Sequence, residues 1–205
     1  MKRVIVILGI ACISSITTAQ SSENETTLRG FHAYNVQDKE GDELFEAIIG
    51  KEKNKVVLVD FWATWCGPCI RAQEELKPHK SKIAPDKVTF VYLTNHTSPM
   101  ETWNNMIPEI QGKHYHLTRK QYDYITERLG VRMFQRLNES QKQNFNQMSE
   151  SQRNAMLTIN SFPMYLILDG NGDEVFFQNG FPGVKTILGK IEEALLAKKE
   201  KTETE

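Results

Sequence analysis

Two cysteines three positions apart are the residues of this sequence with the clearest chemical potential. They stand in the segment Trp65-Cys66-Gly67-Pro68-Cys69, directly after a largely apolar run over residues 56–62. If a helix begins at Cys66, then Cys69 lies one turn later on the same face, within the separation that a disulfide requires. The spacing therefore predicts a pair that cycles between dithiol and disulfide.

The two cysteines are expected to differ in reactivity. At a helix N-terminus the free backbone N–H groups and the helix dipole favour the Cys66 thiolate, which is the nucleophilic form. Cys69, one turn inside the helix, is expected to be more buried and to act second. Pro68 suits the first turn of a helix, where its missing N–H is not needed, and Gly67 allows another backbone to approach closely. The alternative is half of a zinc site, but Cys12 is the only other cysteine, so the pattern favours redox chemistry.

Residues 1–19 have the composition of a secretory signal peptide that is cleaved after Ala19. A basic start is followed by an apolar run over residues 4–13, which is too short to span a bilayer of about 20 apolar residues. The segment before Cys12 also weakly resembles a lipoprotein cleavage box, which would leave Cys12 lipidated. We expect export to the periplasm or envelope, with lipidation as the minor alternative.

Charge and cysteine content narrow the class of protein. The chain has 25 Lys+Arg against 26 Asp+Glu, and residues 1–19 hold two basic residues and no acid, so the mature chain has a formal charge of −3. No cluster of five or more basic residues is present, which argues against nucleic-acid binding. A mature chain with only one cysteine pair, in an oxidising compartment, is typical of an electron carrier and not of a disulfide-stapled scaffold.

The order of predicted elements indicates one α/β domain over residues 31–198, with a central mixed sheet and helices on both faces. A flexible leader is expected over residues 20–30 and a charged tail over residues 199–205. The expected strands cover residues 31–36, 56–62, 88–93, 114–117, 164–168 and 174–178. The expected helices cover residues 42–49, 66–77, 98–110, 118–129 and 184–197, with Thr118 as a cap, Pro78 as a helix end and Gly130 as a stop.

The segment over residues 57–69 resembles the active-site segment of thioredoxins. Together with the signal peptide and the Asp169-Gly170-Asn171-Gly172 turn, it makes the chain similar to the exported, TlpA-like thiol–disulfide oxidoreductases of bacterial envelopes. The resemblance covers residues 31–130 and 160–198. It implies a thioredoxin fold, protein-disulfide reductase activity and no cofactor.

The resemblance also implies roles for individual residues. Cys66 would attack and Cys69 would resolve, with Trp65, Gly67 and Pro68 contacting substrate. Phe162 and Pro163 match the cis-proline position of the family, where the preceding backbone pairs with a substrate peptide. The alternative for Pro163 is an ordinary trans proline that opens a strand.

Asp60 is the third candidate catalytic residue. A carboxyl group inside an otherwise apolar strand is costly unless it is neutral or partnered, and burial raises its pKa. Such a group suits proton transfer with the Cys69 sulfur, and Asp60 matches the buried aspartate of thioredoxins. The alternative is a satisfied structural carboxylate.

The chain departs from the family at four places. Ala72 and Glu74 replace the glutamate and proline that many exported members carry after the second cysteine, and Phe162 replaces a smaller residue. The fourth departure is an insertion over residues 131–158, predicted to be helical. It contains a near-repeat, 138–142 and 149–153, in which each copy has a capping-box pattern. The insertion is consistent with a lid beside the active site or with a helical hairpin packed elsewhere, and the tolerance of loops to insertion favours the hairpin.

The sequence therefore predicts an exported, monomeric protein-disulfide reductase. Its expected partners are disulfide-containing envelope proteins and a membrane thiol reductase that supplies electrons, with no nucleic acid. The alternatives are a disulfide isomerase or oxidase, and a binding or chaperone-like module without turnover. His114 and His116 are interpreted as a surface pair, with no metal site.

Overall fold

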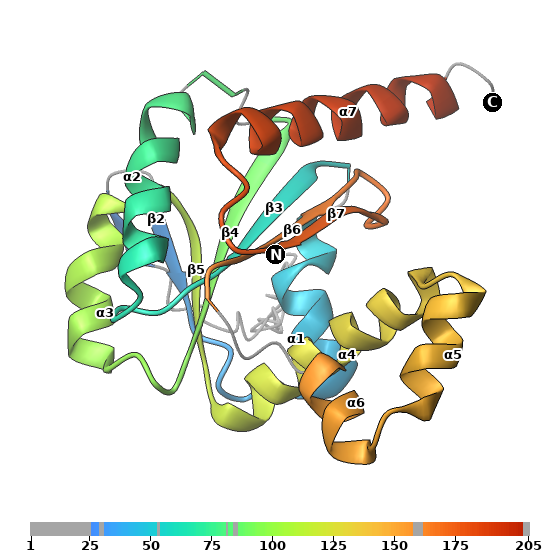
Figure 1. The fold of residues 1–205 in the computed structure, drawn as a ribbon. Coiled ribbons are helices and arrows are strands. Elements are labelled where there is room, and N and C mark those ends of the chain that lie inside the picture. Colours follow the sequence, from blue (N-terminus) through green and yellow to red (C-terminus); the bar gives the residue numbers. More distant parts are fainter. Residues whose placement is uncertain are drawn as a thin grey trace, which may run out of the picture.

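The computed structural model describes residues 26–28, 31–52, 54–80, 82–83, 86–157 and 162–202. Within these ranges the chain forms a seven-stranded mixed sheet in the order β1-β2-β5-β4-β3-β6-β7 (Figure 1). Its strands are β1 (Thr26–Leu28), β2 (Phe31–Tyr34), β3 (Val56–Phe61), β4 (Val88–Asn95), β5 (Gly112–Leu117), β6 (Met164–Leu168) and β7 (Glu174–Asn179). The parallel strands β2, β5, β4 and β3 meet antiparallel β6 and β7, as expected for a mixed sheet.

Helices cover both faces of this sheet. They are α1 (Gly41–Ile48), α2 (Gly67–Lys80), α3 (Met100–Met106), α4 (Arg119–Arg136), α5 (Glu139–Gln147), α6 (Glu150–Leu157) and α7 (Val184–Thr202), with short 3-10 turns η1 (Gly50–Glu52) and η2 (Ile107–Glu109). Alternate residues of β3 point to opposite faces: Val57 and Val59 pack toward α1 and α4, whereas Val56 and Leu58 pack toward α2 and α7. Burial on both faces explains why β3 is almost entirely apolar.

A third apolar cluster lies where β3 leaves the sheet. Trp62 and Ala63 follow the strand, and they pack with Cys66, Cys69 and Trp103 of α3. This cluster fixes the loop between β3 and α2, and therefore fixes the cysteine pair against the body of the domain.

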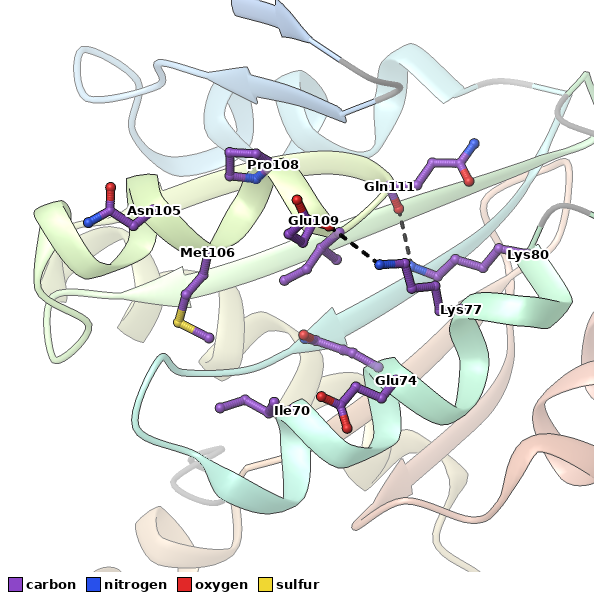
Figure 2. A pocket seen from close by; sticks show the side chains of 11 residues that line it. Ile70, Glu74, Lys77, Lys80, Asn105, Met106, Pro108, Glu109 and Gln111 are labelled. Carbon is purple, nitrogen blue, oxygen red and sulfur yellow. Dashed lines mark hydrogen bonds and ion pairs between the residues drawn. The ribbon is translucent and has the colours of Figure 1, made fainter.

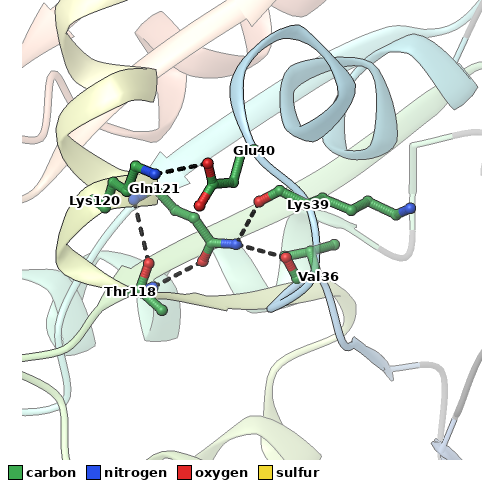
Figure 3. Close-up of polar contacts among 6 residues, drawn as sticks. All are labelled: Val36, Lys39, Glu40, Thr118, Lys120 and Gln121. Carbon is green, nitrogen blue, oxygen red and sulfur yellow. Dashed lines mark hydrogen bonds and ion pairs between the residues drawn. The ribbon is translucent and has the colours of Figure 1, made fainter.

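The start of α4 is tied to the loop after β2 by Gln121 (Figure 3). The Thr118 hydroxyl accepts from the Gln121 N–H at 3.3 Å, and the Gln121 side chain accepts from the Thr118 N–H at 2.9 Å. The Gln121 amide also donates to the Val36 carbonyl at 2.5 Å and to the Lys39 carbonyl at 2.9 Å. The predicted cap at Thr118 is confirmed, and the same glutamine joins two elements far apart in sequence.

Several predicted boundaries were wrong because tertiary contacts override local signals. Helix α2 continues through Pro78 to Lys80, whose buried side chain donates to the Gln111 carbonyl at 3.1 Å and so holds the last turn. Helix α4 continues through Gly130, a residue that costs about 1 kcal/mol inside a helix, and α6 packs along it. Helix α7 reaches Thr202, inside the expected charged tail.

The expected leader is partly structured. Thr26–Leu28 form β1, which pairs antiparallel with β2 and covers an edge that would otherwise expose unpaired backbone groups. The predicted signal peptide, Cys12 and residues 20–25 lie outside the described residues. Among the helices of the described part, none is long and apolar enough to cross a membrane.

The insertion is helical. Its residues form the end of α4 and the pair α5 and α6, which lie at one end of the domain in Figure 1. Both copies of the near-repeat begin with a capping box: Asn138 pairs reciprocally with Gln141, and Ser149 pairs reciprocally with Gln152. The capping pattern read from the sequence is therefore confirmed in both copies.

Candidate functional site

The cysteine pair lies at the turn from β3 into α2. Cys66 immediately precedes the first helical residue, and its carbonyl accepts from the Ile70 N–H at 3.1 Å, as the residue before a helix does. Cys69 lies one turn along, with 5.3 Å between the two Cα atoms, and the two sulfurs form a disulfide. The spacing argument made from the sequence is confirmed.

The surroundings of the two sulfurs are unequal. Cys66 is 3% exposed and Cys69 is fully buried, whereas neighbouring Trp65 is 61% exposed. The Cys69 backbone N–H donates to the Cys66 Sγ at 3.2 Å. Such an amide, at the positive end of a helix dipole, stabilises negative charge on the sulfur once the disulfide is reduced. The geometry favours Cys66 as the thiolate and Cys69 as the buried partner.

The Phe162-Pro163 peptide bond is cis, and it lies beside this pair. Phe162 packs against the cluster that contains both cysteines. Its ring meets the Trp65 ring edge-on at 5.7 Å between centroids and the Tyr122 ring at 6.0 Å. The structure therefore brings together Trp65, the cysteines and Phe162, from segments almost one hundred positions apart. Gly67 is partly buried and Pro68 is exposed on the first turn of α2.

A set of hydroxyl groups after β4 supports the Trp65 loop. The Trp65 indole N–H donates to the Thr97 hydroxyl at 3.1 Å, and the Thr64 N–H donates to the buried Ser98 hydroxyl at 3.1 Å. Thr97 in turn donates to the Asn95 side chain at 2.6 Å. Sequence reasoning missed this support because nothing local to residues 95–98 indicates which loop they meet.

Asp60 is buried in the middle of the sheet, on the face that α2 covers. It is 2% exposed and lies between Tyr92 of β4 and Tyr165 of β6 in the strand register. Gln73 of α2 donates to its Oδ2 at 3.4 Å, and its Oδ1 has no hydrogen-bond partner. Burial raises the pKa of Asp60 to about 7, against the lowering effects of Gln73 and of the Lys80 ammonium. The predicted burial and raised pKa are confirmed.

Lys80 is a buried cation that the sequence analysis missed. Its ammonium group donates to the Tyr92 hydroxyl and to the Gln111 carbonyl, and it is 6% exposed. Burial lowers the pKa of Lys80 to about 8, while the charge of Asp60 raises it. Cys69, Gln73 and Lys80 are spaced four and seven apart on α2, so they lie on one stripe of the helix. That spacing is the signal from which they could have been found.

The histidine pair is not a surface pair. His114 is fully buried and stacks on Tyr92 with 4.8 Å between ring centroids, and its Nε2 lies 2.7 Å from the Ile110 carbonyl. Burial lowers the pKa of His114 to about 4, so Nε2 carries the proton and donates. His116 instead meets the Ser98 carbonyl at 2.8 Å. Among the described residues, no group of three or more His, Cys, Asp or Glu could hold a metal ion.

Ala72 and Glu74, the two departures from the family after the cysteines, lie in different surroundings. Ala72 is buried in the cluster that faces α7, where a longer side chain would meet packed atoms. Glu74 is exposed and lines a pocket between α2 and η2.

A thioredoxin-like family model matches residues 54–174, more than half of the chain. This chain belongs to the thioredoxin-like family. The matched region runs from β3 through the cysteine pair, the helical insertion and the cis proline to the start of β7. It confirms the expected thioredoxin fold and establishes the pair as the CxxC motif of a thiol–disulfide oxidoreductase fold.

Curated relatives match over shorter stretches. A thioredoxin from Mycobacterium tuberculosis (strain ATCC 25618 / H37Rv) is 42% identical over 57 residues, which are 28% of this chain and 48% of the relative. The chloroplastic thioredoxin-like protein CITRX of Solanum tuberosum is 46% identical over 44 residues, 22% of this chain and 25% of the relative. This chain thus spans about half the length of the mycobacterial thioredoxin that it matches.

Solved structures are similar over most of the chain. A putative thiol:disulfide interchange protein DsbE from Chlorobium tepidum has 17% identity and a TM-score of 0.45, covering 71% of this chain and 84% of that one. A DsbF homologue from Corynebacterium diphtheriae has 14% identity and a TM-score of 0.48, covering 71% and 75%. A putative thiol-disulfide oxidoreductase from Bacteroides vulgatus has 22% identity and a TM-score of 0.44, covering 72% and 79%.

Proposed function

We propose that this protein is an exported, TlpA-like thiol–disulfide oxidoreductase that reduces disulfides in other proteins. The observation that carries the proposal is the arrangement of the buried Cys66–Cys69 pair between the exposed Trp65 ring and the cis Phe162-Pro163 segment. A nearly buried redox pair, flanked by an exposed aromatic ring and a cis-proline segment, suits a protein client better than a small oxidant.

The reaction proceeds by two exchanges in the reduced protein. The Cys66 thiolate attacks one sulfur of a client disulfide, which forms a Cys66–client bond and releases the other client sulfur as a thiolate. The Cys69 thiol then gives its proton to Asp60, and the Cys69 sulfur attacks Cys66. The Cys66–Cys69 bond forms, the Cys66–client bond breaks, and the second client sulfur leaves as a thiolate. Two electrons pass from the protein to the client.

The direction of transfer follows from the residues between the cysteines. Gly67 and Pro68 are those of reducing thioredoxins, which lie at about −270 mV, and not those of strong oxidants near about −120 mV. A reductase that works outside the cytoplasm needs a source of electrons. We therefore propose a membrane thiol reductase as the donor and disulfide-containing envelope proteins as the clients.

The client is held by apolar contacts and by backbone pairing. Trp65 and Phe162 form a continuous aromatic wall beside the Cys66 sulfur, which favours clients with an apolar residue next to the reacting cysteine. The family resemblance adds that the backbone before Pro163 pairs with an extended client segment. Because Phe162 is larger than the residue usual in this family, client preference is expected to differ from that of other members.

The proposal is tested by reduction of insulin with dithiothreitol as the electron source. Wild-type protein is expected to accelerate the reaction, and Cys66→Ala is expected to abolish the acceleration. If Cys66→Ala reduces insulin at the wild-type rate and still suppresses client aggregation as the wild type does, the protein is a binding module and not a reductase. If the protein restores the activity of a client with scrambled disulfides faster than it reduces insulin, it is an isomerase. Export is tested separately, by locating the processed chain in the envelope fraction and mapping its N-terminus.

A further inference from the structure

A pocket of about 640 Å³ opens between α2 and the α3–η2 segment, on the flank of the cysteine helix (Figure 2). Ile70, Met106 and Pro108 contribute apolar walls. Lys77 of α2 and Glu109 of η2 form an exposed ion pair with 3.5 Å between charged atoms, so the two walls are linked at the surface. The volume is sufficient for solvent and small solutes to enter.

Two side chains of this pocket interact with Asp60, Gln73 by a hydrogen bond and Lys80 through its charge. Gln73 and Lys80 both line the pocket, and both are only 6% exposed. Gln73 donates to the Asp60 Oδ2, and the Lys80 ammonium lies close enough to Asp60 for the two charges to alter each other's pKa. Asp60, which does not line the pocket, is therefore separated from it by these two polar side chains.

The other groups that face Asp60 do not exchange protons near neutral pH. Tyr92 of β4 and Tyr165 of β6 flank it, and burial raises the pKa of both far above the ordinary value. His114 of β5, stacked beyond Tyr92, stays neutral because burial lowers its pKa to about 4. From α2, Gln73 does not titrate. Lys80 is the one group among these whose pKa lies near that of Asp60.

We propose that the pocket between α2 and η2 is the route by which Asp60 exchanges its proton with solvent, with Gln73 and Lys80 as positioning residues on that route. The inference deepens the proposed reductase cycle and rests on it for its purpose. The Lys80 ammonium, which lines the pocket, first loses a proton to solvent there. The resulting neutral amine then takes the proton that Asp60 received from the Cys69 thiol, which restores the Lys80 ammonium and the Asp60 carboxylate.

The test follows the carboxyl proton itself. Infrared spectroscopy at pH 6 resolves the C=O band of protonated Asp60, identified as the band that Asp60→Asn removes. On mixing into D2O, the shift of this band reports the exchange rate. Glu109→Trp narrows the pocket from an exposed position, whereas Glu101→Trp makes the same change at an exposed position on α3 outside the pocket. Glu109→Trp is expected to slow exchange about tenfold relative to Glu101→Trp. Equal rates would overturn the proposal.

A second pair of variants tests Lys80. Lys80→Ala is expected to slow exchange about tenfold, and n-butylamine, which fits the vacated space, is expected to restore part of the rate. Lys82→Ala, at an exposed lysine two residues after the end of α2, is the control and is expected to exchange as the wild type does. A Lys80→Ala protein with unchanged exchange, or with slowed exchange that the amine does not relieve, would contradict a role for Lys80.

These readouts do not depend on reductase activity. A wild-type protein that fails to reduce any client, yet shows pocket-dependent exchange at Asp60, would refute the proposed function and leave the proton route standing. If the wild-type protein reduces clients but Glu109→Trp and Glu101→Trp exchange at equal rates, the proton route is refuted and the proposed function is retained.

Discussion

At the scale of single residues, the proposed reaction uses a carboxyl group held away from water. The pKa of Asp60 is raised to about 7, chiefly by burial, so the group is near its midpoint at neutral pH. It accepts the Cys69 proton only when ionised. The rate of the second exchange, in which Cys69 displaces the client, is therefore expected to rise with pH through about 7.

Asp60→Asn is expected to remove that pH dependence and to slow the second exchange by about 100-fold. Rapid-quench analysis of the Cys66–client intermediate, after mixing reduced protein with a disulfide client between pH 5 and 9, measures this step directly. An Asn variant with the wild-type rate and pH profile would show that Asp60 is a structural carboxylate.

Asp60 also makes the stability of the folded protein depend on pH, in a direction that its raised pKa determines. Its folded-state pKa, about 7, lies above the ordinary value of 3.8, so between these values the native state binds more protons than the unfolded state. Stability then falls as pH rises from about 4 to 7, a window in which Lys80 is charged in both states. At pH 7.5, Asp60→Asn is expected to raise the free energy of unfolding by about 2 kcal/mol. Urea titrations at pH 5 and 7.5 measure the effect, and an equal change at both pH values would contradict it.

The residues recovered from the sequence are those with a local signal. Cys66 and Cys69 are marked by spacing, Asp60 by its place in an apolar strand, and Pro163 by its position before β6. Gln73 and Lys80 carry only a weak signal, their helical spacing from Cys69, because an amide and a lysine on a helix are usually solvated. Their interaction with Asp60 depends on the packing of α2 against β3, which is a tertiary contact that local sequence does not predict.

At the scale of elements, the contacts of the insertion lead us to expect a helical hairpin packed on α4 and not a lid. Helix α6 packs along α4, and Phe145 of α5 is buried. Replacing residues 138–157 by a short linker is thus expected to lower the melting temperature while leaving the rate of insulin reduction within about twofold. A large loss of rate on protein clients, with the rate on a small disulfide unchanged, would instead establish a lid.

Element types were predicted better than element ends. The buried run of β3 and the helix after the cysteines were recovered because apolar patterning and the Cys–Pro segment agree. Pro78 and Gly130 were misjudged as helix ends, because the contacts of Lys80 and of α6 outweigh local propensity. Strand β1 was missed because its pairing with β2 is a property of the sheet edge and not of three residues.

At the scale of the whole molecule, the described residues contain one cysteine pair, Cys66 and Cys69. The Gly-Pro dipeptide within the pair leads us to expect a reduction potential nearer to about −270 mV than to −120 mV. Equilibration of the protein in dithiothreitol buffers of known ratio, followed by alkylation of free thiols, gives the value. A potential above about −170 mV would contradict net reduction and favour an oxidase or isomerase.

The central claim is that Cys66 carries the client and Cys69 releases it. Cys69→Ala, reduced and mixed with a disulfide-containing protein, tests this directly by mass spectrometry of the unreduced products. We predict a one-to-one adduct linked through Cys66, which dithiothreitol reverses and which Cys66→Ala fails to form. An absence of adduct, or an adduct that still forms in Cys66→Ala/Cys69→Ala, would contradict the account.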